Sequence, residues 1–284
     1  MLNTTNLLSI KFNTIRPETK PDKNAEAVQT QPSKPASGLI SAYLENLARI
    51  NTPAVTQTEK SAPVNYHNDL RKMFNNNEAK ILAIIPRTFN AKDTNGNEYI
   101  DGNEKHGTLL NAIERLDEVK AQGFNTLHVL PIHPPGKMKA MGTAGSIYAP
   151  LDMLKIDPTL IEENDPRSPM EQLKAFVDAC HQRGIRVMLD MPSCASYDMF
   201  IERPELMAKE RDGLAKTPQG WNDIRMFQPW EDEGKRTLNP KLLELHKQYI
   251  DMCIDAGIDG IRADVSRAKP VEFWDIIIPY SRMR

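Results

Sequence analysis

The sequence predicts an α/β protein whose core is a sheet of parallel strands. Three observations lead to this prediction. Four short apolar segments recur between residues 80 and 264, amphipathic segments with helix caps separate them, and the first apolar segment is continuous rather than alternating. Continuous apolar strands joined by helices indicate strands buried on both faces and linked by right-handed crossovers. A doubly wound sheet and a (β/α) barrel both fit this pattern.

The first unit of the predicted sheet runs from residue 80 to residue 132. Its opening strand is KILAIIPRTF at 80–89, followed by the helical segment GTLLNAIERLDEVKAQG at 107–123. Gly123 is expected to end that helix, since glycine readily takes the left-handed conformation found at helix ends. The segment FNTLHVLPI at 124–132 is the second predicted strand.

Two further units repeat this order. Ser168 and Pro169 open a predicted helix at 168–184, because serine caps helix starts and proline suits the first helical position. The strand IRVMLDM follows at 185–191, and after a long polar excursion the helix at 239–257 leads to the strand IDGIRAD at 258–264. The excursion at 192–239 is too long for a structureless loop, so we expect it to fold as an insertion.

The residues before the first strand have a different composition. Residues 1–66 are dominated by Asn, Thr, Lys, Gln, Pro and Ser, as in RPETKPDKNAEAVQTQPSKPAS. Such a segment buries too little apolar surface to offset the entropy of ordering, so we expect most of it to be disordered. A short amphipathic helix is expected at 38–50, where apolar residues recur at near-helical spacing.

Composition narrows the class of protein. The net charge is −2 and the pI is about 6.3, so the chain lacks the basic field that binds nucleic acid or anionic lipid. Its start lacks the pattern of a signal peptide and it has no uninterrupted apolar run of about 18 residues, so we expect a cytoplasmic protein without a membrane span. The three cysteines are widely spaced, which favours reduced, buried thiols over disulfides or a zinc site.

Charged residues stand at the carboxyl ends of the predicted strands, where α/β proteins place their sites. Asp190 ends the third strand, and Arg262 and Asp264 end the fourth. Any single Asp here is most simply a cap for the next helix. Arg262 and Asp264 lie two residues apart on one strand and therefore project to the same side. A guanidinium beside a carboxylate keeps the carboxylate ionised and oriented, as a nucleophile requires.

A polar loop between the first strand and its helix has the sequence DTNGNEYIDGNE. Oxygen atoms recur at every second residue, which lets a tight loop direct them at one hard cation such as Ca²⁺. The candidate ligands are Asp93, Asn95, Asn97, Asp101 and the carbonyl oxygen of Tyr99. Glu98 occupies a position where a calcium-binding loop of this type needs glycine. A polar turn without an ion is the alternative interpretation.

Over residues 80–280 the chain resembles the amino-terminal half of an α-amylase-type catalytic barrel, glycoside hydrolase family 13. The family's fourth strand ends in Gly-x-Arg-x-Asp, matched by Gly260, Arg262 and Asp264. The segment DMPSCA keeps the family's aspartate as Asp190, but Cys194 and Ala195 stand where the family has Asn and His.

The resemblance implies a partial (β/α)8 TIM barrel at 67–284, with about four βα units and the insertion at 192–239 after the third strand. It implies that Asp264 is the nucleophile and Arg262 its partner. Asp190, Tyr148 and Arg267 would bind the substrate, with Tyr148 stacking on the sugar. Because many members of the family hold calcium in a loop like DTNGNEYIDGNE, the resemblance also favours Ca²⁺ over a bare turn.

The implied activity is hydrolysis or transglycosylation of α-glucans or oligosaccharides by a retaining mechanism, which needs a nucleophile and a general acid. In the family the acid is a Glu on the fifth strand, so we expect a truncated chain that is inactive alone. The alternative is a non-catalytic half barrel that binds carbohydrate or assembles with another chain. Helices on the outer face alone would leave the inner face and both edges open, which predicts self-association.

Overall fold

A computed structural model describes residues 66–101 and 104–284, and Ala62–Arg284 forms one compact unit. The helix predicted at 38–50 and all but the last residue of the segment 1–66 lie outside the described residues. Within them, no helix is long and apolar enough to cross a membrane.

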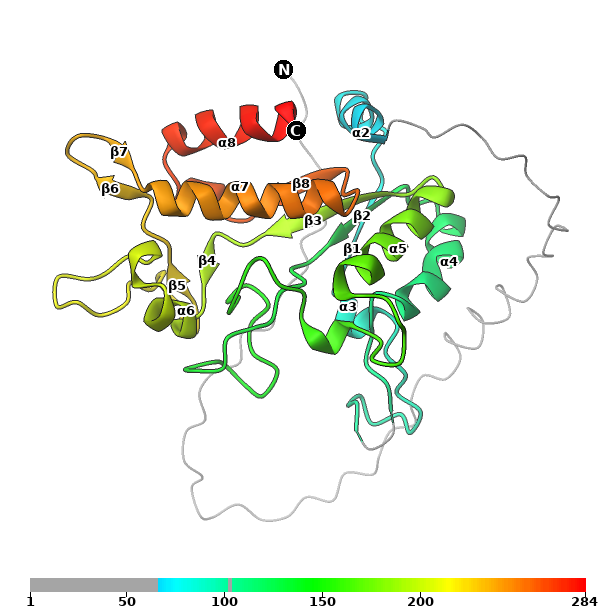
Figure 1. The fold of residues 1–284 in the computed structure, drawn as a ribbon. Coiled ribbons are helices and arrows are strands. Elements are labelled where there is room, and N and C mark those ends of the chain that lie inside the picture. The colour runs from blue at the N-terminus through cyan, green and yellow to red at the C-terminus, as the bar shows by residue number, and fades with distance from the viewer. Residues whose placement is uncertain (1–65, 102–103) are drawn as a thin grey trace, which may run out of the picture. The chain divides into compact units, whose positions relative to one another are not determined.

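The core of the unit is a parallel four-stranded sheet, as the sequence predicts (Figure 1). Its strands, in spatial order, are β1 (Ile81–Ile84), β2 (Thr126–Val129), β3 (Arg186–Met191) and β8 (Gly260–Ala263). The register pairs Asp190 on β3 with Arg262 on β8. The first strand is shorter than predicted, because the chain turns into helix α3 (Pro86–Phe89) at Pro86, a residue without the N–H that would extend the ladder.

Helices connect the strands where the sequence places them. They are α4 (Leu116–Ala121), α5 (Pro169–Gln182), α7 (Pro240–Asp255) and α8 (Val271–Met283). Helix α5 begins with a capping box between Ser168 and Glu171, and Asn239 caps α7. The helix predicted at 107–123 begins later than expected, as the 3₁₀ turn η1 (Asn111–Arg115), because the Asn111 side chain accepts the backbone N–H of Thr108 and holds a turn there.

The two outer strands are less buried than predicted. Leu127, Val187 and Leu189 on the central strands are fully buried. In contrast, β8 is only partly buried along its whole length, and in β1 only Ile84 is buried. Among residues 66–101 and 104–284, each of these strands pairs with a neighbour on one side only, so the prediction of strands buried on both faces is wrong for β1 and β8.

An additional helix, α2 (Tyr66–Asn75), approaches the sheet at Gly260 of β8. Its Leu70 and Met73 are buried, and a Cβ atom at Gly260 would lie 2.8 Å from Leu70 Cδ2. Gly260 faces away from its neighbour Ile261, which lines the outer face beside α7 and α8. Leu70 of α2 thus approaches the inner face of β8, which the expectation of helices on the outer face alone did not include.

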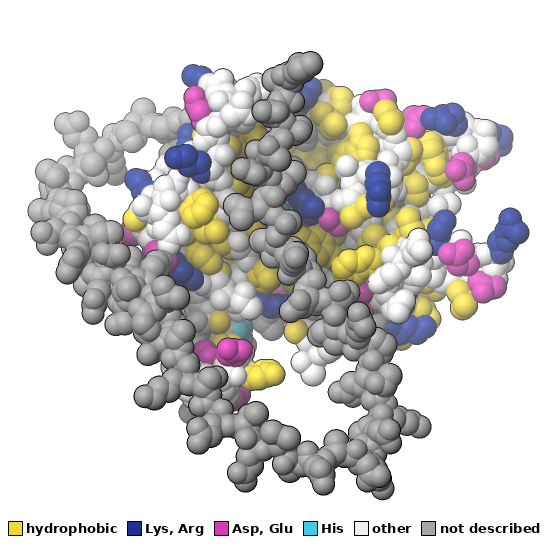
Figure 2. Space-filling view, turned by 180° about the vertical axis from the view of Figure 1, so that it is seen from behind, with side chains coloured by type: hydrophobic (Ala, Val, Ile, Leu, Met, Phe, Trp, Pro, Cys, Tyr) yellow, Lys and Arg dark blue, Asp and Glu magenta, His cyan; other side chains and the backbone are white. Residues whose placement is uncertain are grey.

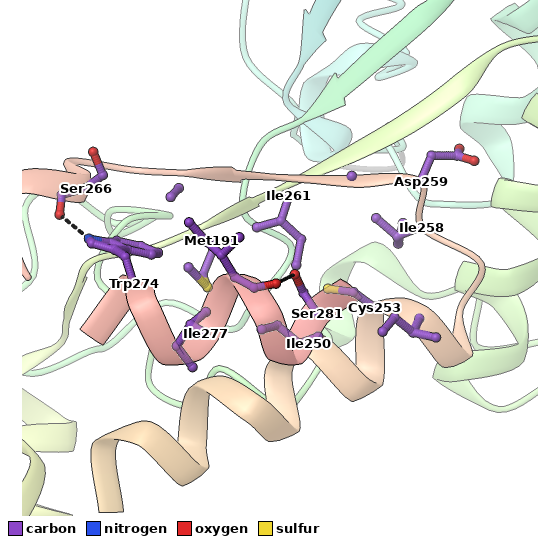
Figure 3. Close-up of a pocket in the computed structure, with 14 residues that line it drawn as sticks. Met191, Ile250, Cys253, Ile258, Asp259, Ile261, Ser266, Trp274, Ile277 and Ser281 are labelled. Atoms are coloured by element: carbon purple, nitrogen blue, oxygen red, sulfur yellow. Dashed lines mark hydrogen bonds between the residues drawn. The ribbon is translucent and has the colours of Figure 1, made fainter. Parts of the chain in front are cut away.

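An apolar groove of about 530 Å³ lies on the outer face of β8, between α7 and α8 (Figure 3). Ile250, Ile261 and Ile277 project into it, and at one end Trp274 Nε1 donates a hydrogen bond to the Ser266 carbonyl at 3.0 Å. Its one acidic residue, Asp259, is held by His181 at 2.8 Å. The groove thus offers packing surface rather than chemistry.

The insertion after β3 is folded. It contains β4 (Cys194–Ala195), α6 (Tyr197–Glu202), the 3₁₀ turn η3 (Pro204–Leu206), β5 (Arg225–Met226), β6 (Trp230–Asp232) and β7 (Thr237–Leu238). Strands β4 and β5 pair antiparallel, as do β6 and β7. The Asn239 side chain donates to the carbonyls of Glu205 and Gln228, which joins the end of the insertion to the start of α7.

The surface carries charges of both signs. Outside the grey atoms of Figure 2, Lys and Arg side chains lie on the same face as Asp and Glu side chains, among hydrophobic patches. The net charge of the whole chain is −2.

Candidate active site

The charged residues at the strand ends meet around one buried carboxylate, that of Asp190. Arg262 Nη1 lies 2.9 Å from Asp190 Oδ2 and 2.7 Å from Asp264 Oδ1. The alternation of side chains along β8 brings Arg262 and Asp264 to one side, and the register with β3 brings Asp190 beside them. One guanidinium nitrogen therefore joins two carboxylates at the same end of the sheet.

Two more donors reach the same Asp190 oxygen. The Tyr148 hydroxyl donates to Asp190 Oδ2 at 2.9 Å, and His128 Nε2 lies 3.0 Å from it. The Asp190 side chain has no exposure to solvent. The buried Asp190 carboxylate therefore orients its three partners, and its contact with a substrate stays a prediction.

The network fixes the protonation of its donors. Burial alone would lower the pKa of Arg262, but its hydrogen bond to Asp190 and the charges of Asp190 and Asp264 raise that pKa above its usual value. Burial, followed by the charge of Asp190, raises the pKa of Tyr148. Both side chains remain donors at neutral pH, so Asp264 always faces a positive partner.

A cavity of about 580 Å³ opens beside Asp264. Tyr148 and Arg267 line it, and Arg267 is exposed, while their contact with a substrate stays a prediction. Trp221, from the insertion, lines it too and is 57% exposed, so its ring is open to a ligand. Aromatic faces and a charged rim are suited to binding a sugar. Among the described residues that line the cavity, Asp264 is the only carboxylic acid.

In the described part of the polar loop, residues 93–101 and 104, the side chains bind the loop's own backbone and one another. Asp93 accepts the backbone N–H groups of Gly96 at 2.6 Å and Glu98 at 2.8 Å. Glu98 has a φ of 66°, the left-handed conformation that glycine would take at this position. Asp101 accepts hydrogen bonds from the side-chain amides of Asn95 and Asn97.

These donors suit a hard cation in kind, since all are carboxylate or amide oxygens. They are however engaged with one another and with the loop backbone. In the ranges 66–101 and 104–284, no group of three or more His, Cys, Asp or Glu residues is arranged to hold a metal. The calcium site therefore stays a prediction.

Three residues of the site escaped sequence reasoning. His128 interrupts an apolar strand, and that break in the pattern was a usable signal. Ser193 donates a hydrogen bond to the Asp264 carbonyl, and the buried Lys269 donates one to the Ser193 carbonyl. Nothing in the pattern marks Ser193, and a lysine is expected on the surface.

No family model matches the chain, but its sequence is similar to those of named enzymes. It is 27% identical over 203 residues to the α-1,4-glucan:maltose-1-phosphate maltosyltransferase of Rhodospirillum rubrum, covering 63% of this chain and 27% of the relative. The corresponding enzyme of Cereibacter sphaeroides is 29% identical over 191 residues, covering 63% and 28%. The chain thus spans less than a third of the length of these relatives.

Two solved structures are also similar to this chain. An α-amylase from Lactobacillus plantarum superposes with a TM-score of 0.52 at 27% identity, covering 69% of this chain and 40% of that one. A cyclic α-maltosyl-(1→6)-maltose hydrolase from Arthrobacter globiformis shares the fold, with a TM-score of 0.54 at 20% identity over 72% and 48% of the two chains. The predicted resemblance to the α-amylase family, glycoside hydrolase family 13, is thus confirmed, and the chain is similar to part of such enzymes.

Proposed function

We propose that this chain carries the nucleophile side of a retaining glycosidase or transglycosylase site for α-glucans. The observation that supports this most is the Arg262 guanidinium shared between the buried Asp190 and the cavity-lining Asp264. The curated relatives are named for α-1,4-glucan and maltose 1-phosphate, which points to α-linked glucosyl units as the substrate class.

In the proposed mechanism an Asp264 oxygen attacks the anomeric carbon of the bound sugar. A bond forms between that oxygen and the carbon, the bond to the leaving oxygen breaks, and the departing oxygen takes a proton from a general acid. The hydrogen bond from Arg262 orients the Asp264 carboxylate, and Tyr148 and Arg267 border the sugar. Water or an acceptor hydroxyl then releases the glycosyl group, which gives hydrolysis or transfer.

The second carboxyl group of this mechanism comes from outside the described residues, in our proposal. Asp264 is the only acid among the described residues lining the cavity. Glu272, which lies in α8, follows it in the sequence, but its carboxylate pairs with Arg236. We further propose that the four strands are part of a (β/α)8 barrel, whose other part would supply the acid.

A non-catalytic role in carbohydrate binding is the second candidate. The observation that favours it is the same single acid in the cavity, because retaining chemistry requires two carboxyl groups about 5 Å apart. In this case Trp221 and Tyr148 would bind a glucan without turnover. The open edges of β1 and β8 also support the proposal that the chain self-associates or pairs with another chain.

A glycosyl fluoride separates the two candidates. Fluoride leaves without protonation, so α-maltosyl fluoride needs only the nucleophile: the Asp264 oxygen forms the bond to carbon while the carbon–fluorine bond breaks and fluoride departs. Without a general base to activate water, the maltosyl ester should persist. We expect intact-mass spectrometry to detect one maltosyl group, mapped to Asp264 by peptide analysis and absent from Asp264→Asn. Maltose binding without labelling would support the binding role and contradict the nucleophile.

We also propose that the loop containing Asp93, Asn95, Asn97, Tyr99 and Asp101 takes Ca²⁺. The alternating oxygen donors and the left-handed Glu98 support this proposal. A bound cation would replace the mutual hydrogen bonds among these side chains and tie the loop to the end of β1.

A further inference from the structure

The residue directly after Asp264 has a strained backbone. Val265 has φ 36° and ψ 53°, in the left-handed region. Among the non-glycine residues of positive φ in the described ranges, it is the only β-branched one; the others are Asn77, Glu98, Lys139 and Arg236. A β-branched side chain in this region is a genuine outlier, and such strain persists only where surrounding contacts enforce it.

Hydrogen bonds from three directions enforce this conformation. The Asp264 N–H donates to the Met191 carbonyl at 3.1 Å, and the Ser193 hydroxyl donates to the Asp264 carbonyl. On the far side, the Ala268 N–H donates to the Val265 carbonyl at 2.8 Å. The peptide between Asp264 and Val265 is thus held from the end of β3 and from η4 (Ser266–Ala268).

Lys269 fixes Ser193 in turn. Its Nζ donates to the Ser193 carbonyl at 3.3 Å, and the side chain lies against the rings of Phe227 and Phe273, with centroids at 5.3 and 5.8 Å. Lys269 is only 5% exposed. A buried ammonium is costly unless it is paired, so packing alone does not account for the position of Lys269 beside two aromatic rings.

The charged groups around Lys269 are few. Burial lowers its pKa to about 8, while Cys194 and Asp264 act in the opposite direction. His246, from α7, faces the same aromatic rings and is neutral, because burial and then the charge of Lys269 lower its pKa to about 3. Asp264 is the carboxylate whose negative charge acts on Lys269.

We propose that Ser193 and Lys269 form a clamp that holds the strained Asp264–Val265 turn and thereby directs the Asp264 carboxylate into the cavity. Both are positioning residues, because they act on Asp264 through its backbone and neither lines the cavity. The catalytic consequence rests on the proposed function, whereas the mechanical link between the clamp and the strain does not.

The mechanical link is tested by the stability of four full-length variants. Replacing Val265 with glycine should lower the unfolding constant roughly 5- to 30-fold relative to Val265→Ala, because only glycine takes this conformation freely. Ser193→Ala should then destabilise the Val265→Gly background more than the wild type. In the wild type, loss of the clamp lets the turn relax and recover its strain, while with glycine there is no strain to recover.

The positioning effect is tested by the rate of labelling with α-maltosyl fluoride. Here Ser193→Ala should act more strongly in the wild type than in the Val265→Gly background, the opposite of its effect on stability. Ser193→Ala should slow labelling at saturating reagent roughly tenfold or more in the wild type, because the relaxed turn misdirects the carboxylate. It should slow labelling less in the Val265→Gly background, where the turn keeps its shape without the clamp. The half-saturating concentration should not change, since Tyr148 and Trp221 remain.

Lys269→Met should behave like Ser193→Ala. The matched control is Lys174→Met, because Lys174 is exposed on α5, and this variant should keep the stability and labelling rate of the wild type. Equal stability costs of Ser193→Ala in both backgrounds would overturn the clamp. A wild-type labelling rate in Ser193→Ala would overturn the positioning role. A wild type that never labels would refute the proposed function instead, and the stability comparison would still decide on the clamp.

Discussion

The packing of α2 on the inner face of the sheet predicts a specific exchange between Leu70 and Gly260. Leu70 is 4% exposed, so Leu70→Ala leaves a cavity and should cost about 3 kcal/mol. For a unit of this size that cost lowers Tm by roughly 6 to 12 °C. Gly260→Ala brings a Cβ atom to 2.8 Å from Leu70 Cδ2, so Leu70 must move. Such overpacking should cost about 1 kcal/mol.

The double variant Leu70→Ala/Gly260→Ala shows whether the two residues are in contact. Gly260 does not have a positive φ, so alanine fits its backbone. With Leu70 shortened, the new methyl group fills vacated space, and alanine suits a strand better than glycine by roughly 0.5 to 1 kcal/mol. Gly260→Ala should therefore destabilise the wild type but stabilise Leu70→Ala, a coupling of about 1.5 to 2 kcal/mol.

Urea unfolding of the four proteins, followed by circular dichroism, measures this coupling. Leu214→Ala is the control for loss of a leucine without loss of packing, because Leu214 is 64% exposed, and it should change stability by less than about 0.5 kcal/mol. If Gly260→Ala has the same effect with and without Leu70, then α2 does not lie on the inner face of β8 and the reasoning fails.

Three further outcomes are expected. Arg262→Lys should slow labelling of Asp264 by α-maltosyl fluoride roughly 100-fold, because one ammonium cannot reproduce the planar guanidinium contacts; a wild-type rate would contradict this. Excess calcium should raise Tm, and Asp93→Ala should abolish the rise, so an unchanged melting curve removes the calcium site. Since the pKa of Lys269 falls from 10.5 to about 8, the unfolded chain binds more protons between these pH values and stability should increase by about 3 kcal/mol through that window. Lys269→Met should lack this increase, and parallel pH profiles of the two proteins would refute it.

The parallel sheet was predictable because its signals are local. Continuous apolar strands, the Ser168 cap and the spacing of Arg262 and Asp264 can all be read from neighbouring residues, and the structure agrees with each. The placement of Asp190 beside Arg262 also follows, since parallel strands bring their carboxyl ends to one edge.

Features that depend on tertiary contact were not predictable. Helix α2 has the sequence YHNDLRKMFN, with few apolar residues, and its position depends on the space that Gly260 leaves open. Lys269 carries a charge that sequence reasoning assigns to the solvent, yet two aromatic rings from distant segments enclose it. The left-handed conformation of Val265 contradicts the preference of its own side chain, so no local rule could have indicated it.

The buried Asp190 carboxylate also decides how the strands align during folding. Continuous apolar strands define their register weakly, because neither face is distinguished by polarity. Asp190 on β3 requires His128 from β2 and Arg262 from β8 at the same height. A slip of one residue along β8 would bring Ile261 or Ala263 beside it and remove the guanidinium that offsets its buried charge, which costs several kcal/mol. The pairing of Asp190 with Arg262 thus rejects the misaligned pairings that the apolar neighbours would tolerate.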